Sequence, residues 1–188
     1  RPPRKYNQFK SALIYYNNLF IKLEVGKMGI DEEAEKIFEN RKNISTLRGA
    51  VISLALEIEY LLDELICFGL FGKEHYNRSF FKETVLHKEF FTFMQKWKVF
   101  RDIKNRGKFP VPVDEKLLHN LSRIVNIRNQ FAHGQLEFSG TVSVLKYYDN
   151  GERTQEISKE YAKEIQELFS KTGAQLANLA YRCDNPDS

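Results

Sequence analysis

The chain has 188 residues, of which 42% are hydrophobic and 29% are charged, and its formal net charge is +4. This length corresponds to about one domain with a real core, and the composition is that of a folded globular protein and not of a disordered one. The small positive charge does not by itself indicate a polyanion partner, so nucleic-acid binding has to be argued from local clusters. The two cysteines, Cys67 and Cys183, show no ligand spacing, which argues against a disulfide framework and a cysteine-based zinc site.

Neither a targeting segment nor a membrane span is visible. The N-terminal basic residues are not followed by the apolar region of a signal peptide. The most apolar stretch, residues 50–71, is interrupted by four acidic residues, Glu57, Glu59, Asp63 and Glu64. We therefore expect no membrane association and a cytoplasmic location.

The hydrophobic periodicity is mostly helical. In chain order it predicts helices over residues 6–23, 31–39, 45–66, 79–103, 114–133 and 158–181. Ser45 or Thr46 is predicted to cap the third of these and Asp114 the fifth, which ends at His133 with Gly134 directly after it. Residues 141–148 and 152–157 predict two strands around the turn Asn150-Gly151. The predicted fold class is all-α, a bundle of about five to six helices with a small β-hairpin before the last helix.

The predicted helix over residues 114–133 carries a charge on its apolar face. At 100° per residue, Arg128 falls at about 20°, in the middle of a stripe that includes Leu117, Leu121, Ile124 and Phe131. A charge on a core stripe is costly unless it is paired or reaches a wet cleft. One interpretation is a snorkelling or ion-paired Arg, for which Glu57 is a candidate partner at the margin of its own apolar face, whereas Glu59 and Asp63 are expected to point further away. The other interpretation is a functional guanidinium.

Two polar residues beside Arg128 favour the functional interpretation. Asn129 and His133 have i, i+4 spacing and lie on one face of the same predicted helix. The helix dipole favours a protonated His133 in the last turn, while Arg128 opposes it by like-charge repulsion. A histidine balanced in this way could titrate near neutral pH, which suits acid–base catalysis.

The string Arg128-Asn129-Gln130-Phe131-Ala132-His133 resembles the signature of the HEPN family, which is an Arg, a polar residue and a His after four to six intervening residues, late in a helical bundle. The resemblance covers roughly residues 46–181. It implies one HEPN-like domain over residues 1–188, with residues 1–44 as an N-terminal helical extension and residues 45–181 as the HEPN core.

The resemblance implies a metal-independent endoribonuclease that cleaves single-stranded RNA by attack of the 2′-OH on the adjacent phosphate. In that mechanism His133 transfers protons, Arg128 binds the phosphate, and Asn129 orients His133 or the phosphate; these roles fit the chemistry of the three side chains. HEPN ribonucleases act as toxins of toxin–antitoxin pairs and as phage-defence effectors. They usually form homodimers whose two motifs line one cleft, so a second copy and an antitoxin or other defence protein are the implied partners. No metal or other cofactor is expected.

A second candidate region is basic. Between residues 96 and 108 six basic residues face one acidic residue, and they are Lys96, Lys98, Arg101, Lys104, Arg106 and Lys108. They predict a track for the RNA backbone, with Trp97 or Phe100 available for stacking on bases. The alternative is a solvated helix C-terminus, where basic side chains are favoured by the helix dipole.

The main alternative function is a binding module. A catalytically silent HEPN domain would sense RNA or a nucleotide, or would bind a partner protein in a defence system. The intact set of Arg128, Asn129 and His133 favours the enzyme, whereas the small net charge favours the binding module.

Overall fold

The computed structural model describes residues 32–139 and 142–186, and this part of the chain is mostly helical. The helix predicted over residues 6–23 lies outside the described residues. The α-helices are α2 (Glu32–Phe71), α3 (His75–Phe81), α4 (Phe93–Asn105), α5 (Glu115–His133) and α6 (Lys159–Asp184), and α3 continues into a short π-helix, η2 (Lys82–Leu86). Three antiparallel strands, in the order β1-β2-β3, lie between α5 and α6: β1 (Gln135–Ser139), β2 (Val142–Tyr148) and β3 (Glu152–Glu156).

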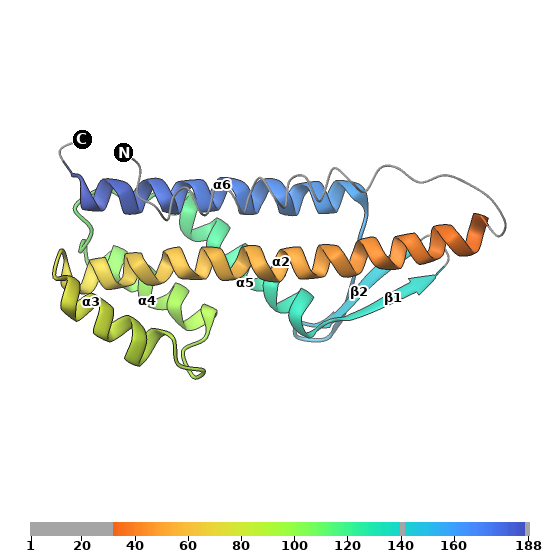
Figure 1. Ribbon diagram of the computed structural model, residues 1–188, viewed down its shortest axis with the longest axis horizontal. Helices are drawn as coiled ribbons and strands as arrows, with labels where there is room; N and C mark the ends of the chain where they lie inside the picture. The colour runs from red at the N-terminus through yellow and green to blue at the C-terminus, as the bar shows by residue number, and fades with distance from the viewer. Residues whose placement is uncertain (1–31, 140–141, 187–188) are drawn as a thin grey trace.

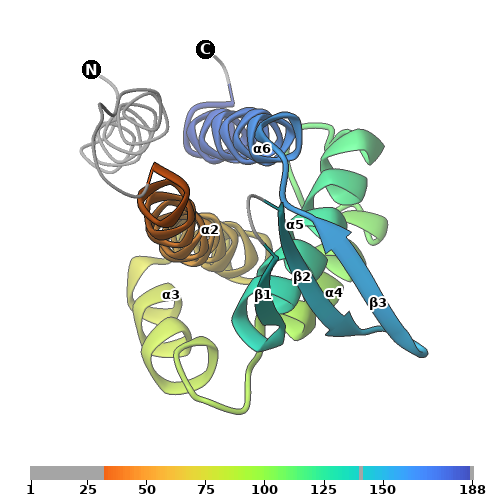
Figure 2. The ribbon, with the colours of Figure 1, turned by 90° about the vertical axis from the view of Figure 1, so that its right-hand side faces the viewer.

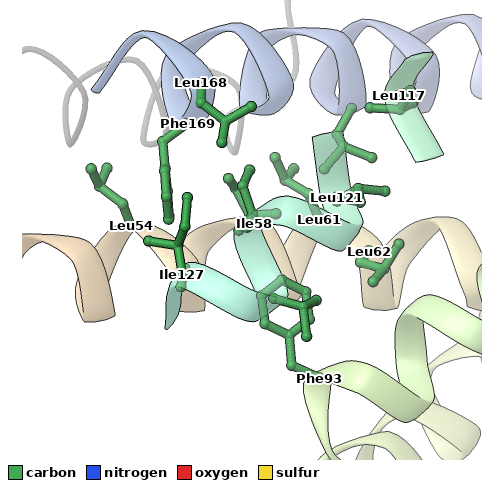
Figure 3. Packing of buried hydrophobic residues seen from close by; sticks show 14 of the residues in the cluster. Leu54, Ile58, Leu61, Leu62, Phe93, Leu117, Leu121, Ile127, Leu168 and Phe169 are labelled. Carbon is green, nitrogen blue, oxygen red and sulfur yellow. The ribbon is translucent and has the colours of Figure 1, made fainter. Parts of the chain in front are cut away.

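Helices α2 and α6 form the long axis of the molecule. They lie side by side and run in the same direction, while α5 crosses behind them and α3 and α4 lie beside the C-terminal half of α2 (Figures 1 and 2). Apolar side chains from α2, α4, α5 and α6 meet between these helices (Figure 3). The predicted stripe of α5 is buried in this core: Leu117, Leu121, Ile124 and Phe131 are at most 3% exposed. Burial of four such side chains is a large stabilising contribution, about 1.5–3 kcal/mol for each.

The predicted break between residues 39 and 45 is wrong, because α2 is one continuous helix of 40 residues. Ser45 and Thr46 lie inside it and do not cap a helix. No Pro or Gly occurs between residues 31 and 48, so nothing in the local sequence forces an end. The proposed boundary between residues 44 and 45 therefore falls within a helix.

The single helix predicted over residues 79–103 is also wrong. Helix α3 and η2 end at Leu86, and α4 begins only at Phe93. Thr92 starts α4 through a capping box, in which its side chain accepts from the Gln95 backbone N–H while the Gln95 side chain accepts from the Thr92 N–H. The new start places residues 87–92 in a connecting segment that faces α2.

The hairpin before the last helix is confirmed, and its turn is at Asn150 and Gly151, which both have positive φ. The structure adds a strand, β1, which pairs with β2 from Gln135↔Lys146 to Ser139↔Val142. This strand follows α5 without a loop, so the end of α5 is attached directly to the sheet. No helix of the described residues is long and apolar enough to cross a membrane.

Helix α5 ends at His133, as predicted, and the glycine that follows is required by close packing. Gly134 has extended backbone angles, φ −74° and ψ 155°. A Cβ atom on it would lie 2.4 Å from the Gln130 carbonyl oxygen and 2.9 Å from the Lys146 carbonyl oxygen. Both atoms belong to the backbone, so a side chain here would have to separate α5 from β2.

Gly134→Ala is therefore expected to lower the free energy of unfolding by about 1–3 kcal/mol, the usual cost of overpacking. Gly49→Ala is the matched control, because Gly49 lies within α2 with nothing within 4 Å of its added Cβ. That change is expected to stabilise the protein by up to about 1 kcal/mol through helix propensity. Urea denaturation of both variants measures the contrast, and equal effects at the two positions would contradict this account of Gly134.

Candidate functional site

A cleft of about 690 Å³ opens between α2, the segment around residues 86–94, the first turn of α4 and the last two turns of α5. Arg128, Asn129 and His133 all line it. Arg128 and Asn129 are half-buried, and His133 is exposed. The lining also includes Glu59, Tyr60 and Asp63 from α2, His87, Lys88, Glu89 and Phe91 from the connecting segment, and Phe93 and Lys96 from α4.

The end of α5 that carries these residues is held by α2. The Arg48 guanidinium on α2 donates through Nη2 to the Ala132 carbonyl oxygen at 2.9 Å, and the Gly134 N–H donates to the Gln130 carbonyl oxygen at 2.7 Å. The Arg48 bond satisfies a carbonyl group that a helix C-terminus leaves without an intrahelical partner. The Gly134 bond continues the i→i−4 pattern of α5 by one residue. Strand β1 begins at Gln135, directly after Gly134. The last turn of α5 is therefore fixed, and so is the backbone position of His133.

The Arg128 guanidinium has no anionic partner within the described part of the chain. Its Nη1 donates to the Asn129 Oδ1 at 3.1 Å, so Asn129 orients Arg128. Glu57, the predicted partner, does not line the cleft, and no ion pair joins it to Arg128 among the residues described. A half-buried guanidinium in a cleft, held by a neutral amide and with nitrogen atoms left over, is an anion-binding arrangement.

Glu59 and Asp63, which the sequence predicted to point away from Arg128, are acidic residues that do line the cleft. The Lys96 Nζ lies 2.7 Å from the Glu59 Oε1 and 3.0 Å from the Asp63 Oδ2. Lys96 is 3% exposed and Asp63 2% exposed, so this is a buried ion-pair cluster. The expectation that Glu59 and Asp63 face away is wrong, because α2 contacts α3, α4, α5 and α6 and is buried on more than the one face that its Leu stripe marks.

Burial shifts the protonation equilibria of this cluster. Desolvation raises the pKa of Asp63 to about 6, although the hydrogen bond and charge of Lys96 act in the opposite direction. The His87 Nε2 lies 3.6 Å from the Asp63 Oδ2. Desolvation, together with the positive charges of Lys82 and Lys96, lowers the pKa of His87, which favours its neutral form at neutral pH.

The predicted basic track does not form one exposed surface with the motif. Of its six residues only Lys96 lines the cleft, and Lys96 is buried and paired. Lys104 pairs with Glu115, and the Arg101 Nη2 lies 3.3 Å from the Asp102 Oδ1. Lys98, Arg106 and Lys108 are exposed outside the cleft.

The aromatic residues of the same segment are structural. Phe100 is fully buried, so the expectation that it is available for stacking is wrong. The Trp97 Nε1 donates to the Leu118 carbonyl oxygen at 3.2 Å, which anchors α4 to α5. The aromatic side chains that line the cleft are instead Tyr60, Phe91 and Phe93.

Sequence reasoning thus missed that His87 and Asp63 line the same cleft as the motif, and it placed Lys96 on an exposed RNA track although this residue is buried and ion-paired. One signal was available for Lys96, which lies on the same face of α4 as the buried Phe93, Phe100 and Ile103, at spacing i, i+3, i+7 and i+10. This signal, a cation on an apolar stripe, is of the same kind as the one that identified Arg128. For His87, which lies in a connecting segment, no periodic signal exists.

Within the described ranges, no group of three or more His, Cys, Asp or Glu side chains is placed to hold a metal ion. Comparison of the chain with protein-family models, with curated proteins and with solved structures finds no significant match. The function therefore has to be argued from the cleft itself and from the short motif on α5.

Proposed function

We propose that this protein is a metal-independent endoribonuclease that cleaves single-stranded RNA, with the cleft at the end of α5 as its active site. The observation that carries the proposal is Arg128. Its guanidinium is half-buried in the cleft, is held by Asn129, and has no carboxylate partner among the described residues. A phosphate diester is the ligand whose charge and geometry suit a guanidinium placed in this way.

The remaining cleft residues fit the same chemistry. His133 lies one turn beyond Asn129 and is exposed, so its imidazole can reach a bound backbone. Lys88 adds a second cation without an acidic partner in the described part of the chain, and Phe91 offers a ring on which an unpaired base can stack. In this proposal Arg128 binds the scissile phosphate and stabilises the charge that develops on it, and His133 transfers a proton.

The HEPN-like motif adds a proposal on assembly and biological role. Two copies would pair by a two-fold axis near His133, so that both motifs face one RNA strand. A toxin or a phage-defence effector is the role that such an activity implies, with an antitoxin or another defence-system protein as the regulating partner.

A binding module is the second candidate, and one observation favours it. The formal charges of the cleft lining cancel: Lys88, Lys96 and Arg128 are opposed by Glu59, Asp63 and Glu89. Such a cleft attracts a long polyanion less strongly than a basic groove does. A catalytically silent domain of this kind would bind RNA or a nucleotide at Arg128 and leave it intact.

The two candidates are separated by incubating labelled single-stranded RNA with the purified chain in EDTA. We expect cleavage by the wild type, and we expect His133→Ala to lower the rate by about 10²-fold or more, the contribution of a positioned acid–base group. His119→Ala is the matched control, because His119 is exposed on the same helix and does not line the cleft. Binding without cleavage by the wild type would identify the silent module, and equal rates for His133→Ala and His119→Ala would remove His133 from the mechanism.

A further inference from the structure

The cleft contains a second histidine besides His133. His87 lies in the segment between η2 and α4, and both histidines line the cleft, although they come from segments 46 positions apart. The His87 side chain is 44% exposed, so it is open to a ligand. Its backbone N–H donates to the Lys82 carbonyl oxygen at 3.0 Å, which ties this residue to the end of η2.

His87 is backed by a buried carboxylate. The His87 Nε2 lies 3.6 Å from the Asp63 Oδ2, an ion-pair distance that is long for a hydrogen bond. The same oxygen accepts from the Lys96 Nζ at 3.0 Å, and Lys96 is held in turn by Glu59 at 2.7 Å. The set Glu59–Lys96–Asp63 thus fixes a negative group directly behind the imidazole.

One atom of this set is left without a partner. The Asp63 Oδ1 is buried and accepts no hydrogen bond within the described residues. A buried acceptor without a donor is costly and requires an explanation. The His87 Nε2 lies 3.6 Å from the other oxygen of this carboxylate, so an Nε2–H directed at Asp63 adds a donor to a group that is short of donors. An imidazolium donates more strongly than a neutral ring.

We infer that His87 is a catalytic residue, the general base of RNA cleavage, and that Asp63 is its positioning residue, so that one subunit carries both proton-transfer groups in one cleft. This inference rests on the proposed function. His133 is then the proton donor of the same reaction.

The proton transfers balance without a co-reactant. With Nε2–H directed at Asp63, the His87 Nδ1 takes the proton of the 2′-OH, and the 2′-oxygen forms a bond to phosphorus. The bond from phosphorus to the 5′-oxygen breaks, and the His133 imidazolium gives its proton to that oxygen. The products are a 2′,3′-cyclic phosphate and a 5′-hydroxyl, and solvent then returns the two histidines to their starting states. Asp63 stabilises the His87 imidazolium during the reaction, as a buried carboxylate behind a catalytic imidazole does.

The charges around His87 suit a base. Lys82 and Lys96 lower its pKa together with desolvation, whereas Glu83 on η2 and Glu59 on α2 raise it, and the net shift is downward. Neutral His87 is therefore the main form at neutral pH, which a general base requires. The rate should fall as the pH drops through the pKa of His87.

The test compares His87→Ala, His133→Ala and the control His119→Ala in single-turnover cleavage of two RNAs. One RNA has the natural 5′-oxygen at the scissile bond, and the other has sulfur there, a leaving group that departs without a proton donor. His87→Ala is expected to cleave both RNAs about 10²–10⁴-fold more slowly than the wild type. His133→Ala is expected to be slow on the oxygen RNA and to recover most of its rate on the sulfur RNA.

Four outcomes decide the inference. Wild-type rates for His87→Ala, with His133→Ala inactive, would overturn it and leave the proposed function standing. Recovery of His87→Ala by the sulfur RNA would overturn the role of base. Loss of the acidic limb of the pH–rate profile in His87→Ala, with unchanged KM, would support it, since a merely structural residue would not remove that limb. Failure of the wild type to cleave any RNA would remove the proposed function, and this inference with it.

Discussion

Arg128→Met is expected to lower RNA cleavage by about 10²-fold or more, the scale of losing one preorganised transition-state donor, without lowering the midpoint of thermal unfolding. Arg128 lies on a face of α5 whose other members are core residues, and within the described chain it has no ion pair to lose. A methionine of similar length fills this position with apolar atoms and removes the cost of half-burying an unpaired charge.

Arg128→Lys tests the geometry of the same contact. The ammonium keeps the charge but cannot donate to Asn129 and to two phosphate oxygens from one planar group, so we expect little recovery of cleavage. Thermal unfolding is measured beside single-turnover cleavage for both variants. A stable Arg128→Met protein with wild-type cleavage would reduce Arg128 to a packing residue.

Lys96→Met is expected to have the largest effect on stability. Removing this ammonium leaves the Asp63 carboxylate buried without its cation, and breaking a buried pair from one side costs about 3–5 kcal/mol. Lys98→Met is the matched control, because Lys98 is exposed on the same helix, and its effect should stay within about 0.5 kcal/mol. Adding Asp63→Asn to Lys96→Met removes the stranded charge and should recover part of the loss.

The loss in Lys96→Met should depend on pH. Lys96 lowers the pKa of Asp63, which is nevertheless raised to about 6 in the folded protein. Without Lys96 the folded pKa is higher still, so the folded variant binds a proton that the unfolded chain has released. The penalty is therefore present above that pKa and shrinks as the pH falls towards 5. Urea denaturation at pH 5 and pH 8 measures it, and a penalty of equal size at both would show that Asp63 is not the stranded group.

Local chemistry made α5 predictable. Asp114 caps its start by accepting from the Lys116 backbone N–H, the apolar stripe sets its buried face, and Gly134 follows its end. The candidate site residue Arg128 was visible because it interrupts that stripe. The capping box of Thr92 and Gln95 and the alternation of Leu136 and Phe138 in β1 were equally readable signals of elements that sequence reasoning missed.

The cleft itself could not be read from the sequence, because it joins segments that are separated along the chain. Glu59 and Asp63 lie on α2, and His87 follows η2. Lys96 lies in the first turn of α4, and His133 ends α5. Helical periodicity gives the face of each helix but not which helices meet. Helix α2 is also buried on several sides, so the direction of its main apolar stripe does not show which acidic residues are buried. That stripe favoured Glu57 as a partner, whereas Glu59 and Asp63 are the carboxylates that reach Lys96.

If this cleft cleaves RNA through the 2′-OH, a pair of labelled oligonucleotides incubated with the wild-type protein in EDTA will show it directly. One is an all-RNA strand, and the other carries a 2′-deoxy residue at the cleavage position mapped on the first. We expect the RNA to be cut to a product ending in a 2′,3′-cyclic phosphate and the substituted strand to stay intact at that position. An intact RNA strand, or cleavage that ignores the 2′-deoxy substitution, would contradict it.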